Sequence, residues 1–85
     1  MVSFMFTVKD EVGLDARSAG LLVKEAAKCT GKVTIHKGEK NGDAKMIFNV
    51  LGLSIKRNEE VEIFVEGENE EEEAAALEAF VKENL

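Results

Sequence analysis

The sequence predicts an α+β open-faced sandwich, in which three helices cover one face of a four-stranded antiparallel sheet. Three short segments alternate between apolar and polar residues, a fourth follows a hairpin turn as a return strand, and three others have helical periodicity or helix-start signals. These segments follow one another in the order βαββαβα. Of the 85 residues, 45% are hydrophobic, enough for one modest core. We therefore expect residues 1–85 to form a single domain.

The first two predicted elements are a strand over residues 2–8 and a helix over residues 16–29. The strand alternates, which is typical of a half-buried strand. Four apolar residues of the helix follow the i, i+3, i+4, i+7 pattern and should face the core: Ala19, Leu22, Val23 and Ala26. The opposite face carries Arg17, Leu21, Lys24 and Lys28. Gly31 is expected to end the helical region.

The middle of the chain predicts a hairpin and a short helix. Residues 32–36 alternate again, and a turn over residues 37–39 leads to a return strand over residues 40–45. We expect this return strand at a sheet edge, because it contains Asn41, Gly42 and Asp43. Residues 46–53 are interpreted as a short helix, although a strand stays open because periodicity cannot decide so brief a run.

The last two elements are a strand over residues 61–66 and a helix that begins near residue 70. Asn69 is the expected N-cap of this helix. The acidic run 70–73 occupies its first turn, where negative side chains interact favourably with the helix dipole, so we interpret the run as a helix start. The buried face of the helix should comprise Ala74, Leu77, Phe80 and Val81.

Charge and cysteine content exclude several classes of function. The net charge of -6 argues against nucleic acid and against anionic membrane surfaces as partners. No apolar run approaches the length of a membrane span, and the N-terminal residues lack the features of a signal peptide. Cys29 is the only cysteine and cannot form an internal disulfide, so we expect a reducing, cytoplasmic environment.

Two residues whose side chains can take part in reactions, His36 and Cys29, are interpreted as structural. His36, the only histidine, should face solvent from the second strand, and we assign it no role in group transfer. Cys29 should be a small buried apolar residue. No second cysteine or histidine lies near it in the sequence, and no phosphate-binding or hydrolase motif is present. We therefore expect no metal and no cofactor.

The most informative stretch runs from Gly13 to Val23, where a loop enters the first helix. A helix start has unpaired backbone N–H groups and the positive end of the dipole, and both attract anions. Asp15 stands at the N-cap, so its carboxylate should accept the backbone N–H of Arg17 or Ser18. Such a cap stabilises a helix by about 1 kcal/mol.

Over its whole length the chain resembles HPr, the histidine-containing phosphocarrier family of the bacterial sugar phosphotransferase system. The resemblance rests on Gly13-Leu14, Ala16-Arg17, Ala19 with the following Leu-Leu-Val, Lys45, Ile47, Val50, Leu51, Leu53, the strand 61–67 and the Ala-rich last helix. It implies the HPr-like open-faced sandwich. In that family a histidine before Ala-Arg-Pro accepts a phosphoryl group from enzyme I and passes it to an enzyme IIA.

Both phosphorylation sites of the family are missing here. Asp15 stands at the position of the phosphoacceptor histidine, and Met46 at that of the serine phosphorylated by a regulatory kinase in Gram-positive relatives. Ser18 replaces the proline, and only Arg17 remains of the residues that carry the transfer. Because Ser18 has the backbone N–H that proline lacks, Asp15 and Ser18 make sense together as a helix cap.

Three interpretations of Asp15 remain open. It can be an ordinary N-cap, or it can be a fixed negative charge with which an interaction protein partly imitates a phosphorylated carrier. It can also accept phosphate as an acyl phosphate, which the helix start and Arg17 would stabilise. The last ranks lowest, because a carboxylate tied to cap N–H groups is a poor nucleophile and no neighbouring carboxylates suggest a magnesium site.

The resemblance also implies a docking surface formed by eight residues: Ala16, Arg17, Gly20, Leu21, Lys24, Ile47, Phe48 and Leu51. It is basic and apolar, which favours acidic protein partners with an apolar groove, such as enzyme I, enzyme IIA or a transcriptional regulator. We therefore predict a regulatory interaction protein that uses this surface. The alternative functions are a phosphocarrier that uses Asp15 and a relic or altered carrier without a partner of its own.

Overall fold

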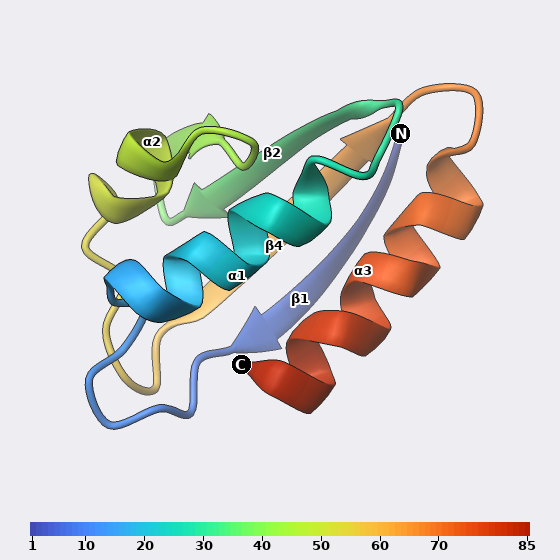
Figure 1. Cartoon of the computed structure of the whole chain (residues 1–85). Helices are drawn as coiled ribbons and strands as arrows, with labels where there is room; N and C mark the ends of the chain where they lie inside the picture. Colours follow the sequence, from blue (N-terminus) through green and yellow to red (C-terminus); the bar gives the residue numbers. More distant parts are fainter.

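The computed structural model describes residues 1–85 and has the predicted element order. The elements are β1 (Val2–Thr7), α1 (Ala16–Ala26), β2 (Lys32–Lys37), β3 (Lys40–Asp43), α2 (Ile47–Leu51), β4 (Glu60–Glu66) and α3 (Glu70–Asn84). The strands form one antiparallel sheet in the order β1-β4-β2-β3, and the helices lie on one face of it (Figure 1). The predicted open-faced sandwich is therefore confirmed, and no helix is both long and apolar enough to cross a membrane.

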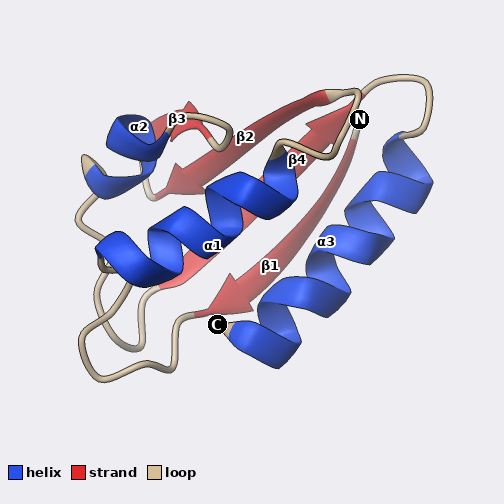
Figure 2. Ribbon diagram, in the orientation of Figure 1, coloured by secondary structure: helices blue, strands red, loops and turns tan.

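The core lies between the sheet and the helix layer, and Figure 2 shows these two layers as separate sets of helices and strands. Alternate strand residues such as Val33, Ile35 and Ile63 point into it, and Leu22 of α1 and Leu77 of α3 meet them from the helix side. Burial of these apolar side chains is the main favourable term in folding. The alternation in the sequence is thus explained by a sheet with one buried face.

The second face of the sheet has no helix over it. His36 lies there, half-buried, with its ring centroid 4.6 Å from that of Phe64. Ser3 Oγ donates a hydrogen bond of 2.9 Å to Glu62 Oε2 on the neighbouring strand. The histidine therefore packs on an aromatic neighbour at the open face, on the solvent side where the strand pattern predicted it.

Four predicted elements are shorter than expected: β1 ends at Thr7, α2 spans only Ile47–Leu51, and α1 and β3 also end early. Helix α1 ends at Ala26, so Cys29 and Gly31 belong to the connection to β2. A Cβ atom added to Gly31 would lie 2.5 Å from the Glu66 carbonyl oxygen, so glycine lets this connection pass close to the end of β4. The return strand β3 ends at Asp43, because the Asp43 carboxylate accepts the Lys45 backbone N–H at 2.9 Å and turns the chain.

The start of α3 differs from the prediction in its capping group. Asn69 occupies the N-cap position, but its side chain makes no capping hydrogen bond. Two other carboxylates of the first turn bind backbone N–H groups outside the helix: Glu70 accepts the Gly67 N–H at 3.1 Å, and Glu73 accepts those of Thr30 and Gly31 at 2.6 and 3.1 Å. The acidic first turn therefore holds α3 to the loop before it and to the end of the α1 connection.

Candidate functional site

Asp15 and Ser18 form a reciprocal cap at the start of α1. Asp15 has an extended backbone, and its Oδ1 accepts the Ser18 backbone N–H at 3.0 Å. In return, Ser18 Oγ accepts the Asp15 backbone N–H at 3.0 Å, and Oγ also lies 3.1 Å from Asp15 Oδ1. Ser18 is only 3% exposed, so the serine side of this cap is shielded from water, whereas Asp15 is half-buried. The backbone N–H groups of Arg17 and Ser18 were the two predicted donors to the Asp15 carboxylate, and the hydrogen bond is made by Ser18.

The cap also fixes the charge of Asp15. Hydrogen bonds from the backbone and side chain of Ser18 hold the pKa of the Asp15 carboxyl below its usual value, with a smaller contribution from the Arg17 guanidinium. The backbone N–H and the hydroxyl group of Ser18 both donate to Oδ1 of Asp15, whereas Oδ2 accepts no hydrogen bond within the chain. The site therefore presents an ionised carboxylate with one oxygen anchored and one oxygen free.

Arg17 contacts an acidic residue that the sequence did not single out. Its Nη2 lies 3.5 Å from Oδ2 of Asp10, in the loop that precedes α1. Asp10 Oδ1 accepts the Val12 N–H at 3.2 Å, and the Asp10 carbonyl oxygen accepts the Gly13 N–H at 2.9 Å. The turn thus holds the Asp10 carboxylate close to Arg17. Nothing in the periodicity of the sequence marks this contact, because Asp10 lies outside any helix or strand.

Acidification is expected to destabilise the fold, and Asp15→Asn is expected to reduce this sensitivity. The pKa of Asp15 is lower in the folded chain than in the unfolded chain. Its ionised form therefore contributes stability above about pH 4, and this contribution is lost as the pH falls through the folded pKa. The pKa values of Glu59, Glu70 and Glu73 are lowered too, so protonation of these carboxylates in acid also destabilises the fold.

Urea unfolding between about pH 6 and pH 3 measures this effect. Asparagine is as good an N-cap as aspartate but does not titrate, so the variant should be close to the parent in acid and should lose less stability on acidification. An equal loss in both proteins would show that the Asp15 carboxylate is not stabilised in its ionised form.

The predicted docking surface is assembled where α1 and α2 lie side by side over the sheet (Figure 1). A Cβ atom on Gly20 would lie 3.9 Å from Ile47 Cδ1, so the two helices approach each other closely at this glycine. Phe48 is 83% exposed and is the most exposed of the large hydrophobic residues. Met46, which the resemblance places at the family's regulatory-serine position, is 56% exposed.

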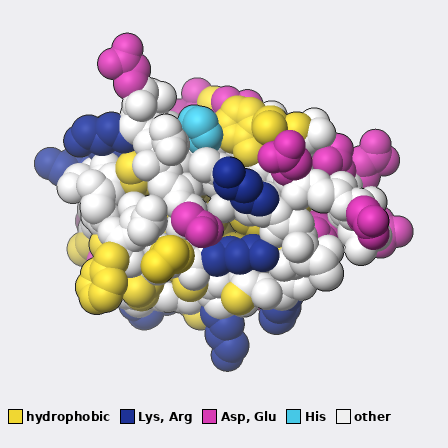
Figure 3. Space-filling view, turned by 90° about the horizontal axis from the view of Figure 1, so that it is seen from above, with side chains coloured by type: hydrophobic (Ala, Val, Ile, Leu, Met, Phe, Trp, Pro, Cys, Tyr) yellow, Lys and Arg dark blue, Asp and Glu magenta, His cyan; other side chains and the backbone are white.

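The other residues of the docking surface are exposed or half-buried. The exposed ones are Ala16, Arg17 and Lys24, and the half-buried ones are Gly20, Leu21, Ile47 and Leu51. Figure 3 looks down on the molecule and shows exposed hydrophobic side chains on the side where α2 lies, with lysine or arginine side chains nearby. The sequence-predicted residues are therefore all accessible, at least in part, on one side of the helix layer.

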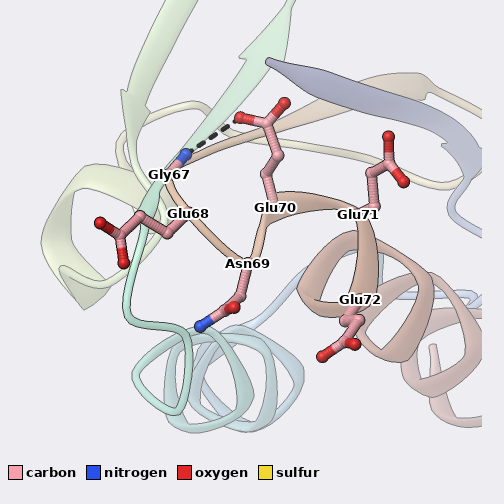
Figure 4. A pocket seen from close by; sticks show the side chains of 6 residues that line it. All are labelled: Gly67, Glu68, Asn69, Glu70, Glu71 and Glu72. Atoms are coloured by element: carbon pink, nitrogen blue, oxygen red, sulfur yellow. Dashed lines mark hydrogen bonds between the residues drawn. The ribbon is translucent and has the colours of Figure 1, made fainter.

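An open hollow of about 440 Å³ at the start of α3 is the main alternative site, and it has no converging ligands. Gly67, Glu68, Asn69, Glu70, Glu71 and Glu72 line it. Figure 4 shows the Glu70 carboxylate turned to the Gly67 N–H, while those of Glu68, Glu71 and Glu72 point in separate directions. Of these side chains, Glu70, Glu71 and Glu72 belong to the acidic first turn of α3, which the sequence indicated as a helix start.

Cys29 lines a smaller hollow of about 200 Å³ between α3 and the end of α1. The thiol is buried, as predicted, and burial raises its pKa, so the reactive thiolate form is disfavoured at neutral pH. No group of three or more His, Cys, Asp or Glu side chains is arranged to hold a metal ion. The candidate functional site therefore consists of the capped Asp15 carboxylate, Arg17 and the predicted docking surface.

Comparison with known proteins shows similarity over nearly the whole chain. The family described as PTS HPr component phosphorylation site matches residues 2–83. The phosphocarrier protein HPr of Mycoplasma capricolum is 38% identical over 77 residues, which cover 91% of this chain and 86% of that protein. The HPr-like protein Crh of Bacillus subtilis is 35% identical over 85 residues, covering 100% of both chains. The crystal structure of HPr-C-His from Thermoanaerobacter tengcongensis matches with a TM-score of 0.90 at 30% identity, covering 96% of this chain and 92% of that one.

Proposed function

Because the chain belongs to the HPr family of the bacterial sugar phosphotransferase system, we propose that it is a regulatory protein of that system that binds other proteins through its docking surface. The observation that carries this proposal is the reciprocal cap of Asp15 and Ser18. The cap occupies the position of the family's phosphoacceptor with a fixed charge, and it uses the buried Ser18 to hold that charge in place.

The docking surface supports a binding role independently of Asp15. Aromatic side chains at the centre of an interface often contribute most of its binding energy, and Phe48 is fully available for such a contact. Arg17 and Lys24 lie on the exposed face of α1 beside it. A partner with an apolar groove and nearby carboxylates fits this combination. Enzyme I, an enzyme IIA and a transcriptional regulator are the partner classes we propose, in the cytoplasm.

A relative supports the regulatory role by its name. Crh of Bacillus subtilis is called HPr-like, and its solution structure describes it as the catabolite repression HPr. We carry the regulatory role over from it to this chain. The regulatory serine is not carried over, because Met46 stands at that position and has no hydroxyl group. The regulation that we propose therefore acts through the docking surface and not through a phosphoserine at position 46.

The second candidate function is a phosphocarrier that uses Asp15. One observation favours it: Oδ2 of Asp15 has no hydrogen bond and the side chain is half-buried, so one oxygen is free to attack a phosphoryl group. In that reaction the phosphohistidine of enzyme I would give its phosphoryl group to Oδ2. We rank this function second, because the lowered pKa of the carboxyl makes its oxygens weaker nucleophiles.

Phe48→Ala is expected to weaken partner binding without weakening the fold. Truncating an aromatic anchor at the centre of an interface costs about 2 kcal/mol or more, which is about thirtyfold in affinity. Because Phe48 is 83% exposed, thermal unfolding should be nearly unchanged. Calorimetric titration with enzyme I, an enzyme IIA and a regulator of the family measures the affinity.

Met5→Ala is the matched control, because Met5 is an exposed hydrophobic residue on the helix-free face of the sheet. It should bind all partners as the parent does. If no partner binds the parent, or if the partner that binds does so equally well after Phe48→Ala, the proposed docking surface is wrong.

A further inference from the structure

Lys37, the last residue of β2, binds the connection between α2 and β4. Its Nζ donates hydrogen bonds to the carbonyl oxygens of Leu53 and Ser54, at 3.1 and 2.9 Å. Nζ also lies 3.1 Å from Oε1 of Glu59, and the lysine side chain is only 22% exposed. We infer that Lys37 is a positioning residue of the functional site, because it holds the connection against which the loop before Asp15 packs. The inference rests on the proposed function, in which the fixed charge of Asp15 takes part in binding.

The connection between α2 and β4 has two residues in unfavourable backbone conformations. Ser54 has a φ of 51° and Asn58 a φ of 71°, and non-glycine residues rarely adopt such left-handed conformations. They persist where surrounding contacts enforce them. Glu59 Oε1, which binds Lys37, also accepts the Lys56 N–H at 2.7 Å. The ammonium group of Lys37 is therefore one of the contacts that enforce this backbone.

The loop before Asp15 packs directly on the same connection (Figure 1). The Leu14 N–H donates a hydrogen bond of 2.9 Å to the Ile55 carbonyl oxygen. A Cβ atom on Gly13 would lie 2.8 Å from the Cα atom of Lys56, so the two backbones are in close contact. The residue just before the capped carboxylate is thus anchored to the connection and not to α1.

The beginning of this loop is anchored to the connection as well. The Val8 N–H donates to the Glu59 carbonyl oxygen at 3.0 Å, and the Val8 carbonyl oxygen accepts the Asn58 N–H at 2.8 Å. Both ends of the loop over residues 9–14 are therefore bound to residues 55–59. The conformation of the connection sets where the loop delivers the chain to the start of α1.

Removal of the Lys37 ammonium group should be felt at this start. The carbonyl groups of Leu53 and Ser54 would lose their donor, and the Glu59 carboxylate would lose its cation. Ile55 follows Ser54 in the chain, so the hydrogen bond from Leu14 to its carbonyl oxygen should weaken first. A functional site keeps its geometry only while the residues around it are held in place.

The test compares the isotope-labelled full chain with Lys37→Met, which keeps a long apolar side chain but has no charge. NMR should show amide hydrogen exchange at Leu14 about tenfold faster relative to the amides of β2 and β4. The pKa of the Asp15 carboxyl should rise toward its ordinary value as the hydrogen bonds from Ser18 weaken. Calorimetric titration should show an affinity for enzyme I about threefold lower than that of the parent.

Three further variants isolate the role of the ammonium group. Lys37→Arg keeps the charge and should restore the parental values. Lys32→Met is the matched control, because Lys32 lies at the other end of the same strand, is exposed and makes no hydrogen bond or ion pair. Glu59→Gln keeps an acceptor for the Lys56 N–H but removes the ion pair, so it should cause smaller changes of the same kind even if Lys37→Met folds poorly. Circular dichroism checks the fold of each variant.

Equal responses of Leu14 and Asp15 to Lys37→Met and Lys32→Met would overturn the inference. An unchanged affinity for enzyme I in a variant whose Asp15 pKa has risen would overturn it too, because Lys37 would then position a residue that binding does not use. If the parent itself binds none of the proposed partners, the docking function is wrong. That failure is read from the parent alone, so it is distinguishable from a failure of Lys37 to position Asp15.

Discussion

The double variant Asp15→His, Ser18→Pro is expected to accept a phosphoryl group from enzyme I, whereas the unchanged chain accepts none. The two substitutions remove the reciprocal cap and restore the pair of residues that the family uses at these positions. Arg17 and the docking surface are unchanged, so enzyme I should still be able to dock. Incubation with enzyme I and radiolabelled phosphoenolpyruvate, followed by gel separation, measures the transfer.

The single variant Ser18→Pro is the control for this gain. It removes the Ser18 N–H that anchors Asp15 but supplies no imidazole, so it should stay unlabelled if the gain depends on the histidine and not on release of the cap. Circular dichroism must show that both variants are folded. A folded double variant that binds enzyme I but takes up no label would show that the start of α1 does not correspond to the family's transfer site.

Gly13→Ala is expected to cause a large loss of stability. Gly13 has a φ of 71°, a conformation that side chains rarely adopt. A Cβ atom there would lie 2.5 Å from the Ile55 carbonyl oxygen, the same atom that accepts the Leu14 N–H at 2.9 Å. The conformational penalty and the forced movement of backbone together cost about 2–4 kcal/mol. Thermal unfolding should show a decrease in Tm of more than about 10 °C.

Gly38→Ala separates the two contributions to this effect. Gly38 has a φ of 58° but has no atom within 4 Å of an added Cβ, so only the conformational penalty of about 1 kcal/mol applies. If Gly13→Ala costs no more than Gly38→Ala, the close approach of the Gly13 loop to the Ile55 carbonyl is not present in solution.

The elements and the cap could be predicted because each depends on residues close together in the sequence. Alternation over 61–66 shows directly which side chains of β4 are buried. The contact of Asp15 with Ser18 spans only three residues. Periodicity and N-cap preference report interactions of this range. The docking surface, by contrast, was predicted from the family resemblance, and its composition alone would not have defined it.

The contacts that escaped prediction join distant parts of the chain or lie within loops. Glu73 accepts hydrogen bonds from Thr30, 43 residues away, and no local pattern indicates that pairing. Asp10 reaches Arg17 only because the intervening turn folds back. Asn69 was expected to cap α3 on residue preference, and it occupies the N-cap position, but its side chain makes no capping hydrogen bond. In the first two cases, contacts outside any local sequence pattern decided the outcome.

The most direct test of the account is the phosphotransfer assay on the unchanged chain. The chain is incubated with enzyme I and radiolabelled phosphoenolpyruvate, and any labelled product is treated with hydroxylamine, which cleaves acyl phosphates. The account predicts that the chain stays unlabelled while an HPr relative in the same assay is labelled. Label on the chain that hydroxylamine releases, and that Asp15→Ala abolishes, would show that Asp15 carries phosphate and would contradict the regulatory interpretation.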